Sequence, residues 1–392
     1  MLALRKRRME ASPPILRGGF RPFFFGAATW GMIALTLWLC SLAGVLHLPT
    51  KLDPLAWHRH EMLFGFVGAA VAGFLLTAIP NWTGRLPIAG KPLLALFSLW
   101  CAARVALLFS ALLGLWVAAI LDIGFFAVLT ALGTREILAA KNRNFPIVLM
   151  ALLFTLADAA DYAASDGLIP NVGWKAALAL IIVMISVIGG RIIPSFTRNW
   201  MVKQGQKTGL PVQPAALDIM VIAGTVICLL FWVVFPDNYL TGFLLMLAAA
   251  LQLLRLSRWG GARTLRDPLV LILHVGYAWI PAGLLLLGLS VAGFSIPATA
   301  GIHALTAGAM TTMILAVMTR ATLGHTGRAL IANTATSLLY ACVTAAALLR
   351  VTAGLGLAPQ TAMLELSGLA WLGSLAIFLL NYGPILWQPR SE

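Results

Sequence analysis

Charged residues are scarce in this chain. They make up 10% of its 392 residues, whereas 60% are hydrophobic and the mean hydropathy is +0.93. Soluble domains contain about 25% charged residues, so this composition excludes a soluble protein and indicates a polytopic membrane protein. The 27 Lys and Arg outnumber the 13 Asp and Glu. They lie in short gaps between apolar runs, which is typical of cytoplasmic loops and not of a surface that binds nucleic acid.

Cysteine is also rare. The four cysteines each lie in an apolar run, and no two are close in sequence. This excludes a C-x-x-C redox pair and a C-x-x-C-H haem attachment, so any haem would be held non-covalently. The chain also lacks a phosphate-binding loop, a G-x-S-x-G elbow and an H-E-x-x-H motif, which argues against phosphate-loop hydrolysis and zinc-protease chemistry.

Long apolar runs are abundant. A helix that crosses a bilayer needs about 20 apolar residues. We therefore predict an all-α integral membrane protein of twelve transmembrane helices, with residues 1–392 forming a single polytopic domain in the lipid bilayer. The predicted spans are 22–46, 59–80, 91–110, 113–133, 145–164, 174–195, 215–235, 239–255, 268–290, 298–319, 330–350 and 363–386. The basic residues gather in alternate loops, which predicts that both termini are cytoplasmic.

A weak internal repeat recurs where three of the spans end. The second span ends in Thr83-Gly84-Arg85, the sixth in Thr197-Arg198 and the tenth in Thr319-Arg320. These matches predict three four-helix units, at about 20–135, 143–256 and 266–388, in a pseudo-threefold arrangement. Chance similarity at three loop starts is the alternative.

Two of the six histidines, His58 and His60, stand with Glu61 at the outer start of the second span. Residues three apart share a helix face, whereas residues two apart do not. We therefore predict that His58 and Glu61 can contribute to one metal site and that His60 serves another partner. Two interfacial histidines that bind water and headgroups are the alternative.

His303 lies at a similar depth in the tenth span. Small residues follow it at Ala304, Ala307 and Gly308, and such residues allow close approach of a neighbour or of a flat macrocycle. The repeat makes the second and tenth spans equivalent, so we predict that His60 and His303 are opposed haem ligands, with His58 as the alternative ligand. Ordinary helix packing around a buried histidine is the competing interpretation.

Two further histidines are candidates. His274 shares a helix face with Tyr277 in the ninth span and could bind a second metal or relay protons, although a buried, hydrogen-bonded histidine is the plain alternative. His325 lies in a predicted basic loop from Arg320 to Arg328, which could hold haem propionates or anionic lipid, or could simply be solvated.

Ionisable residues inside spans are costly and usually have a role. We expect a structural ion pair among Arg104, Asp158 and Asp161. Further residues of this kind have no obvious partner or could bind a carboxylate: Asp122, Arg191 and Glu365. With His274 they suggest one competing function, a secondary transporter. A non-catalytic haem- or metal-binding membrane sensor is another.

The motifs along the chain together resemble the NnrS family of bacterial membrane proteins. The similar stretches are 19–24, 57–65, 72–84, 190–198, 273–279, 303–308 and 318–328. The resemblance implies a multi-pass inner-membrane protein that contains haem b and copper and acts in nitric oxide and nitrosative stress defence. It implies binding or redox conversion of nitric oxide, or protection of iron centres. It assigns no histidine to either metal and implies no particular redox partner.

Overall fold

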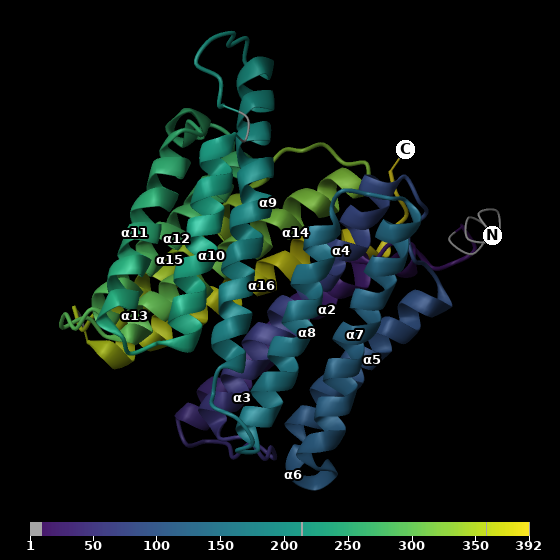
Figure 1. The fold of residues 1–392 in the computed structure, drawn as a ribbon. Coiled ribbons are helices and arrows are strands. Elements are labelled where there is room, and N and C mark those ends of the chain that lie inside the picture. The colour runs from purple at the N-terminus through teal and green to yellow at the C-terminus, as the bar shows by residue number, and fades with distance from the viewer. Residues whose placement is uncertain (1–9, 213–214, 358, 392) are drawn as a thin grey trace. The chain divides into compact units, whose positions relative to one another are not determined.

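The computed structural model describes residues 10–212, 215–357 and 359–391. Helices dominate these ranges, and no strand occurs within them (Figure 1). Twelve helices of this part of the chain are long and apolar enough to cross a membrane, which confirms the predicted class and number of spans. The cytoplasmic placement of the termini stays a prediction.

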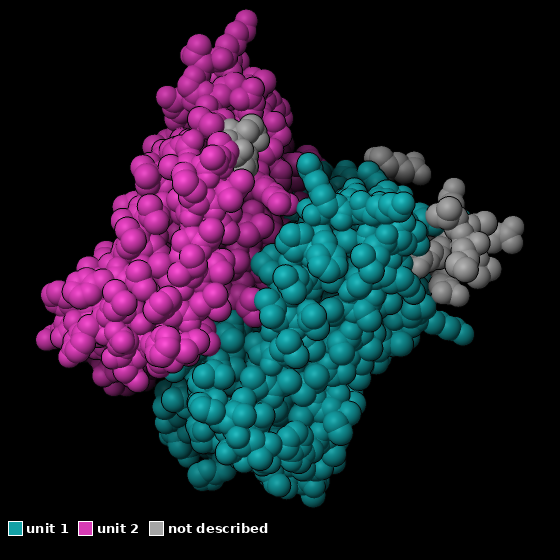
Figure 2. Space-filling model, viewed as in Figure 1, with its two compact units in different colours: residues 1–177, 321–328, 378–392 teal, residues 178–320, 329–377 magenta. Residues whose placement is uncertain are grey.

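The contacts within the chain define two compact units, coloured separately in Figure 2. Unit 1 comprises residues 1–177, 321–328 and 378–392, and unit 2 comprises residues 178–320 and 329–377. The elements of unit 1 are η1 (Pro14–Leu16), α2 (Phe20–Leu42), α3 (Pro54–His60), η2 (Glu61–Val67), α4 (Gly68–Thr83), α5 (Lys91–Leu108), α6 (Ser110–Leu113), α7 (Leu115–Ala139) and α8 (Phe145–Ser165). The three predicted four-helix repeats stay a prediction.

Unit 2 holds most of the remaining helices. They are α9 (Gly173–Lys203), α10 (Ala216–Val234), α11 (Tyr239–Ser257), η3 (Gly261–Thr264), α12 (Pro268–Val291), α13 (Ala298–His303), η4 (Ala304–Met310), α14 (Thr311–His325), α15 (Thr334–Gly354) and α16 (Gln360–Trp387). The first residues of α9 and the last residues of α14 and α16 belong to unit 1.

Local sequence signals explain where several helices begin. The Asp53 side chain accepts hydrogen bonds from the amides of Leu55 and Ala56 and so caps α3, which has proline at its first position. Gly114, at φ +91°, separates α6 from α7 in a conformation that glycine adopts without strain. The Asn238 side chain caps α11. The structure therefore breaks the chain between the third and fourth predicted spans and between the seventh and eighth, as the predicted spans require.

The second and tenth spans share an irregularity. Each contains seven π-helical residues, Glu61–Val67 in η2 and Ala304–Met310 in η4, and each π segment starts directly after a histidine, His60 or His303. Such i→i+5 segments are rare and occur often at functional sites. The sixth span, α9, has no π segment among its described residues, so the similarity joins two of the three spans that the repeat predicted to be equivalent.

One predicted loop is helical. The prediction of a basic loop from Arg320 to Arg328 was wrong for its first part, because α14 continues to His325. Its last turn carries the buried Thr322, whose carbonyl oxygen accepts a hydrogen bond from the hydroxyl of Thr326, just beyond the helix. The helix stops before Gly327, at φ +77°. The basic residues predicted a loop here, but the chain stays helical through the apolar and threonine residues that lie between them.

Candidate functional site

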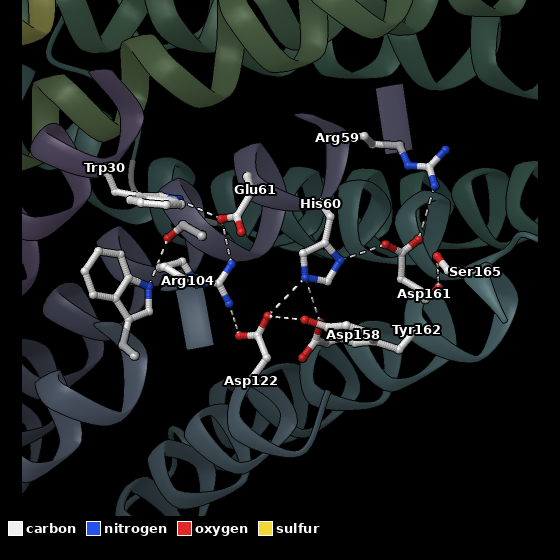
Figure 3. Close-up of polar contacts among 12 residues, drawn as sticks. Trp30, Arg59, His60, Glu61, Arg104, Asp122, Asp158, Asp161, Tyr162 and Ser165 are labelled. Atoms are coloured by element: carbon white, nitrogen blue, oxygen red, sulfur yellow. Dashed lines mark hydrogen bonds and ion pairs between the residues drawn. The ribbon is translucent and has the colours of Figure 1, made fainter. Parts of the chain in front are cut away.

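His60 is the centre of a buried polar cluster in unit 1 (Figure 3). Its Nδ1 lies 2.9 Å from Asp161 Oδ2 and its Nε2 lies 3.0 Å from Asp122 Oδ2. Ionised carboxylates only accept hydrogen bonds, so both ring nitrogens donate when these two aspartates are ionised. The His60 side chain is 1% exposed. Contacts of this kind hold the imidazole in one orientation.

Glu61, the next residue, turns to a different partner. Its Oε2 accepts from Trp30 Nε1 at 2.6 Å and from an Arg104 guanidinium nitrogen at 2.8 Å. The same guanidinium forms a close ion pair with Asp122. Arg104 therefore joins the second and fourth spans. It does not form the predicted ion pair with Asp158 or Asp161, and Asp122 does have counter-ions.

Asp158 is the exception in this cluster. It is fully buried, and neither of its carboxylate oxygens has a hydrogen-bond partner. Its nearest cationic group is His60, with Nε2 3.7 Å from Asp158 Oδ1. Asp161 has a second neighbour, Arg59, at 3.5 Å. Within the described part of the chain, His60, Asp122 and Asp158 form the one group of three metal-capable side chains whose ligand atoms all lie within 4.8 Å.

The backbone places these groups by simple periodicity. Asp158, Asp161 and Tyr162 are three and four residues apart on α8, so they share one face, and Tyr162 donates to Asp122 Oδ2 at 3.2 Å. His60 and Glu61 lie where α3 passes into the π-helical η2. Their side chains point to separate partners, the aspartates for His60 and Arg104 for Glu61 (Figure 3).

His58, the remaining predicted ligand of the second span, has a different neighbour. The His58 ring stacks on Trp38, with centroids 4.7 Å apart. The structure thus gives His58 and Glu61 different neighbours. It also gives His58 and His60 different neighbours, as the predicted division of their roles requires.

His303 has a simpler environment in unit 2. Its Nδ1 lies 2.8 Å from the Thr299 carbonyl oxygen, which can only accept, so Nδ1 carries the proton and the lone pair is on Nε2. The face that carries His303, Thr306 and Ala307 is partly exposed on its own unit. A histidine held in this way by a backbone carbonyl is typical of metal ligands.

The remaining predicted residues are dispersed. His274 Nε2 lies 2.8 Å from Thr197 Oγ1, and its buried Nδ1 has no partner. The His325 ring lies 5.5 Å from that of Phe20, and the Arg320 guanidinium lies 4.0 Å from the Phe196 ring. Within the described ranges, neither His274 nor His325 belongs to a group of three metal-capable side chains.

Unit 2 contains a second buried polar network. Tyr277 is the one residue of this network that the sequence had marked as a candidate. Arg255 donates to Asp218 Oδ1 at 2.7 Å, to the Ser186 carbonyl oxygen at 2.8 Å and to Tyr277 Oη at 2.8 Å. Gln252 completes it by accepting from Tyr277 at 2.6 Å. The sequence signal was available, since Gln252 and Arg255 share a helix face three residues apart. Arg255, however, is the last residue of the eighth predicted span, where a basic residue is expected next to a cytoplasmic loop.

Two residues of the transporter interpretation lie on the surface of unit 2. Arg191 and Glu365 are both exposed in the described structure of this unit. Gly190, beside Arg191, has the Arg255 guanidinium packed against it. The absence of a side chain at Gly190 therefore makes room for the Arg255 guanidinium.

Comparison with known proteins gives one strong match. The family model described as NnrS protein matches residues 14–390, nearly the whole chain. A comparison with curated proteins gives no match.

Proposed function

The chain belongs to the NnrS family, and on that premise we propose that it binds haem b non-covalently at His303 and acts in the defence of a bacterial inner membrane against nitric oxide. Family membership supports the biological role. The observation that supports the ligand is the hydrogen bond from His303 Nδ1 to the Thr299 carbonyl oxygen, which presents Nε2 as a lone-pair donor.

The surroundings of His303 fit a flat ligand. Thr306 and Ala307 follow it on the same partly exposed face, and both side chains are small. Arg350, on α15, acts electrostatically on His303, and no ion pair of Arg350 is found in the described residues. In this proposal the arginine binds a haem propionate and Thr299 holds the imidazole in register.

His60 fits the role of haem ligand less well. Both of its ring nitrogens face carboxylates, so ligation of iron would break one of two short hydrogen bonds. We therefore propose His303 as the haem ligand, whereas His60 stays bound to Asp122 and Asp161. Copper stays a family-implied second metal, and the predicted ligands His58, Glu61 and His274 each contact other protein groups.

Bound haem iron would supply an open or exchangeable position that binds nitric oxide and can change oxidation state. The protein's own contribution follows from its contacts. Thr299 fixes the tautomer of His303, and the π-helical segment η4 starts at the next residue, Ala304. Binding or redox conversion of nitric oxide and protection of iron centres are all compatible with this arrangement.

Optical and EPR spectra of the purified chain from haem-replete cells test this proposal. We expect a Soret band that is lost in His303→Ala and kept in His47→Ala, a matched control at an exposed loop histidine. Arg350→Gln should weaken haem retention without abolishing it. A wild-type preparation without haem would overturn the haem proposal. If His303→Ala kept its full haem content and His60→Ala lost it, His60 and not His303 would be the haem ligand.

A further inference from the structure

We propose that His60, Asp122 and Asp158 form a binding site for a divalent cation that accepts both nitrogen and oxygen ligands, such as Zn²⁺ or Mn²⁺, and that Asp161 orients the histidine. This site lies in unit 1 and uses none of the residues that we propose for haem. It also differs from the predicted pairing of His58 with Glu61.

The separations of the ligand atoms suit one ion. His60 Nε2 lies 3.0 Å from Asp122 Oδ2 and 3.7 Å from Asp158 Oδ1. Tetrahedral coordination with bonds of 2.0–2.1 Å places neighbouring ligand atoms about 3.3 Å apart. The two observed separations lie on either side of this value, so small side-chain shifts would complete three positions of a coordination sphere.

Charge balance points to a divalent cation. The buried cluster contains four carboxylates, whereas Arg59, Arg104 and a protonated His60 supply at most three positive charges. An unbalanced charge is costly away from water. A divalent ion with neutral His60 and the two arginines balances all four carboxylates.

The contacts of Asp158 favour a metal ion over a proton as the source of the missing positive charge. A protonated Asp158 would carry an O–H donor, yet neither of its oxygens has a hydrogen-bond partner and the side chain is fully buried. The extra proton would neutralise the charge but leave a buried donor unpaired. A metal ion beside His60 Nε2 would satisfy a carboxylate oxygen directly, and the close-up shows Asp158 beside this nitrogen (Figure 3).

Asp161 supplies the outer contact that metal-bound histidines usually have. It lies 2.9 Å from His60 Nδ1, so it accepts that proton and leaves Nε2 for the ion. On binding, the ion replaces the Nε2 proton, which is released to solvent, and no electron is transferred. The group contains no sulfur ligand, so it favours Zn²⁺ or Mn²⁺ over Cu(I).

Metal retention by the full-length protein tests the site. The purified chain is stripped with EDTA, incubated separately with Zn²⁺, Mn²⁺ or Cu(I), desalted and analysed by ICP-MS. We expect about one Zn²⁺ or Mn²⁺ per wild-type chain. Asp158→Asn should lose at least tenfold in affinity, and Asp161→Asn about 10–100-fold, as expected for a lost outer contact. Asp158→Glu should restore part of the binding.

The control is Asp166→Asn, which removes an exposed carboxylate just beyond the same helix, α8. It should bind as the wild type does. Wild-type protein that retains neither ion, or Asp158→Asn that retains them fully, would overturn the proposal. The zinc and manganese content is measured independently of haem. The metal-site proposal and the haem proposal can therefore be overturned separately.

Discussion

Each unit has a buried arginine that pairs with an acidic side chain in a network with a tyrosine, but only one of the two networks is complete. Arg104 in unit 1 and Arg255 in unit 2 are each 1% exposed, and each pairs with an aspartate on a neighbouring helix. A tyrosine closes each network, Tyr162 through Asp122 and Tyr277 through Arg255. The two networks therefore use the same kinds of side chain.

The networks differ in their balance of charge. In unit 2, Asp218 is held by Arg255, by Arg258 at 3.8 Å and by the Ala215 amide at 3.0 Å. No buried side-chain nitrogen or oxygen of that described network lacks a partner. In unit 1 the carboxylates outnumber the cations, and Asp158 has both oxygens unpaired. A satisfied network holds helices together, whereas an unbalanced one is suited to bind a cation.

The largest expected effect comes from removing each arginine. Arg104→Met and Arg255→Met should each lower the free energy of unfolding by about 3–5 kcal/mol, because they leave buried carboxylates unpaired. We expect the larger loss for Arg104, since Asp218 keeps Arg258 and a backbone amide. Unfolding by SDS in mixed micelles measures both, and Arg135→Met, whose side chain is 54% exposed, is the control. A larger loss for Arg255→Met would contradict the comparison.

A smaller effect should differ in sign between the units. In EDTA, Asp218→Asn should lower the free energy of unfolding by about 2–3 kcal/mol, because it removes the charge that Arg255 needs. Under the same conditions Asp158→Asn should raise it by about 1 kcal/mol, because it removes the one buried negative charge that exceeds the positive charges of the cluster. Thermal unfolding in detergent with and without EDTA gives the comparison. Destabilisation of equal size by both variants would show that the two networks are alike.

A third test, of steric effects, uses two glycines that make room for these networks. A Cβ at Gly65 would lie 2.8 Å from Trp30 Nε1, which donates to Glu61, and a Cβ at Gly190 would press on the Arg255 guanidinium. Each Gly→Ala change should cost about 1–2 kcal/mol by overpacking. The controls are Gly124→Ala and Gly373→Ala, where a Cβ meets nothing within 4 Å. Controls as destabilised as the test variants would remove the steric explanation.

Several features of the site were predictable from residue type and spacing. Apolar length and loop charge predicted twelve spans, and helical periodicity predicted that His58 and His60 have different partners. The cost of buried charge predicted an ion pair among Arg104, Asp158 and Asp161, but Arg104 pairs with Glu61 and Asp122 instead. The choice of acid was wrong because Asp122, Asp158 and Asp161 are equally acidic, and only the packing of the helices decides which one the guanidinium reaches.

The sequence by itself determined the membrane class, the number of spans and the family, because these depend on composition, run length and motifs along the chain. The tertiary structure decided which charges meet. It placed α8 so that Asp161 and Asp158 face His60, and it left Asp158 without a hydrogen bond. Buried ionic contacts depend on ångström-scale distances between helices that are far apart in sequence, and spacing along the chain does not define those distances.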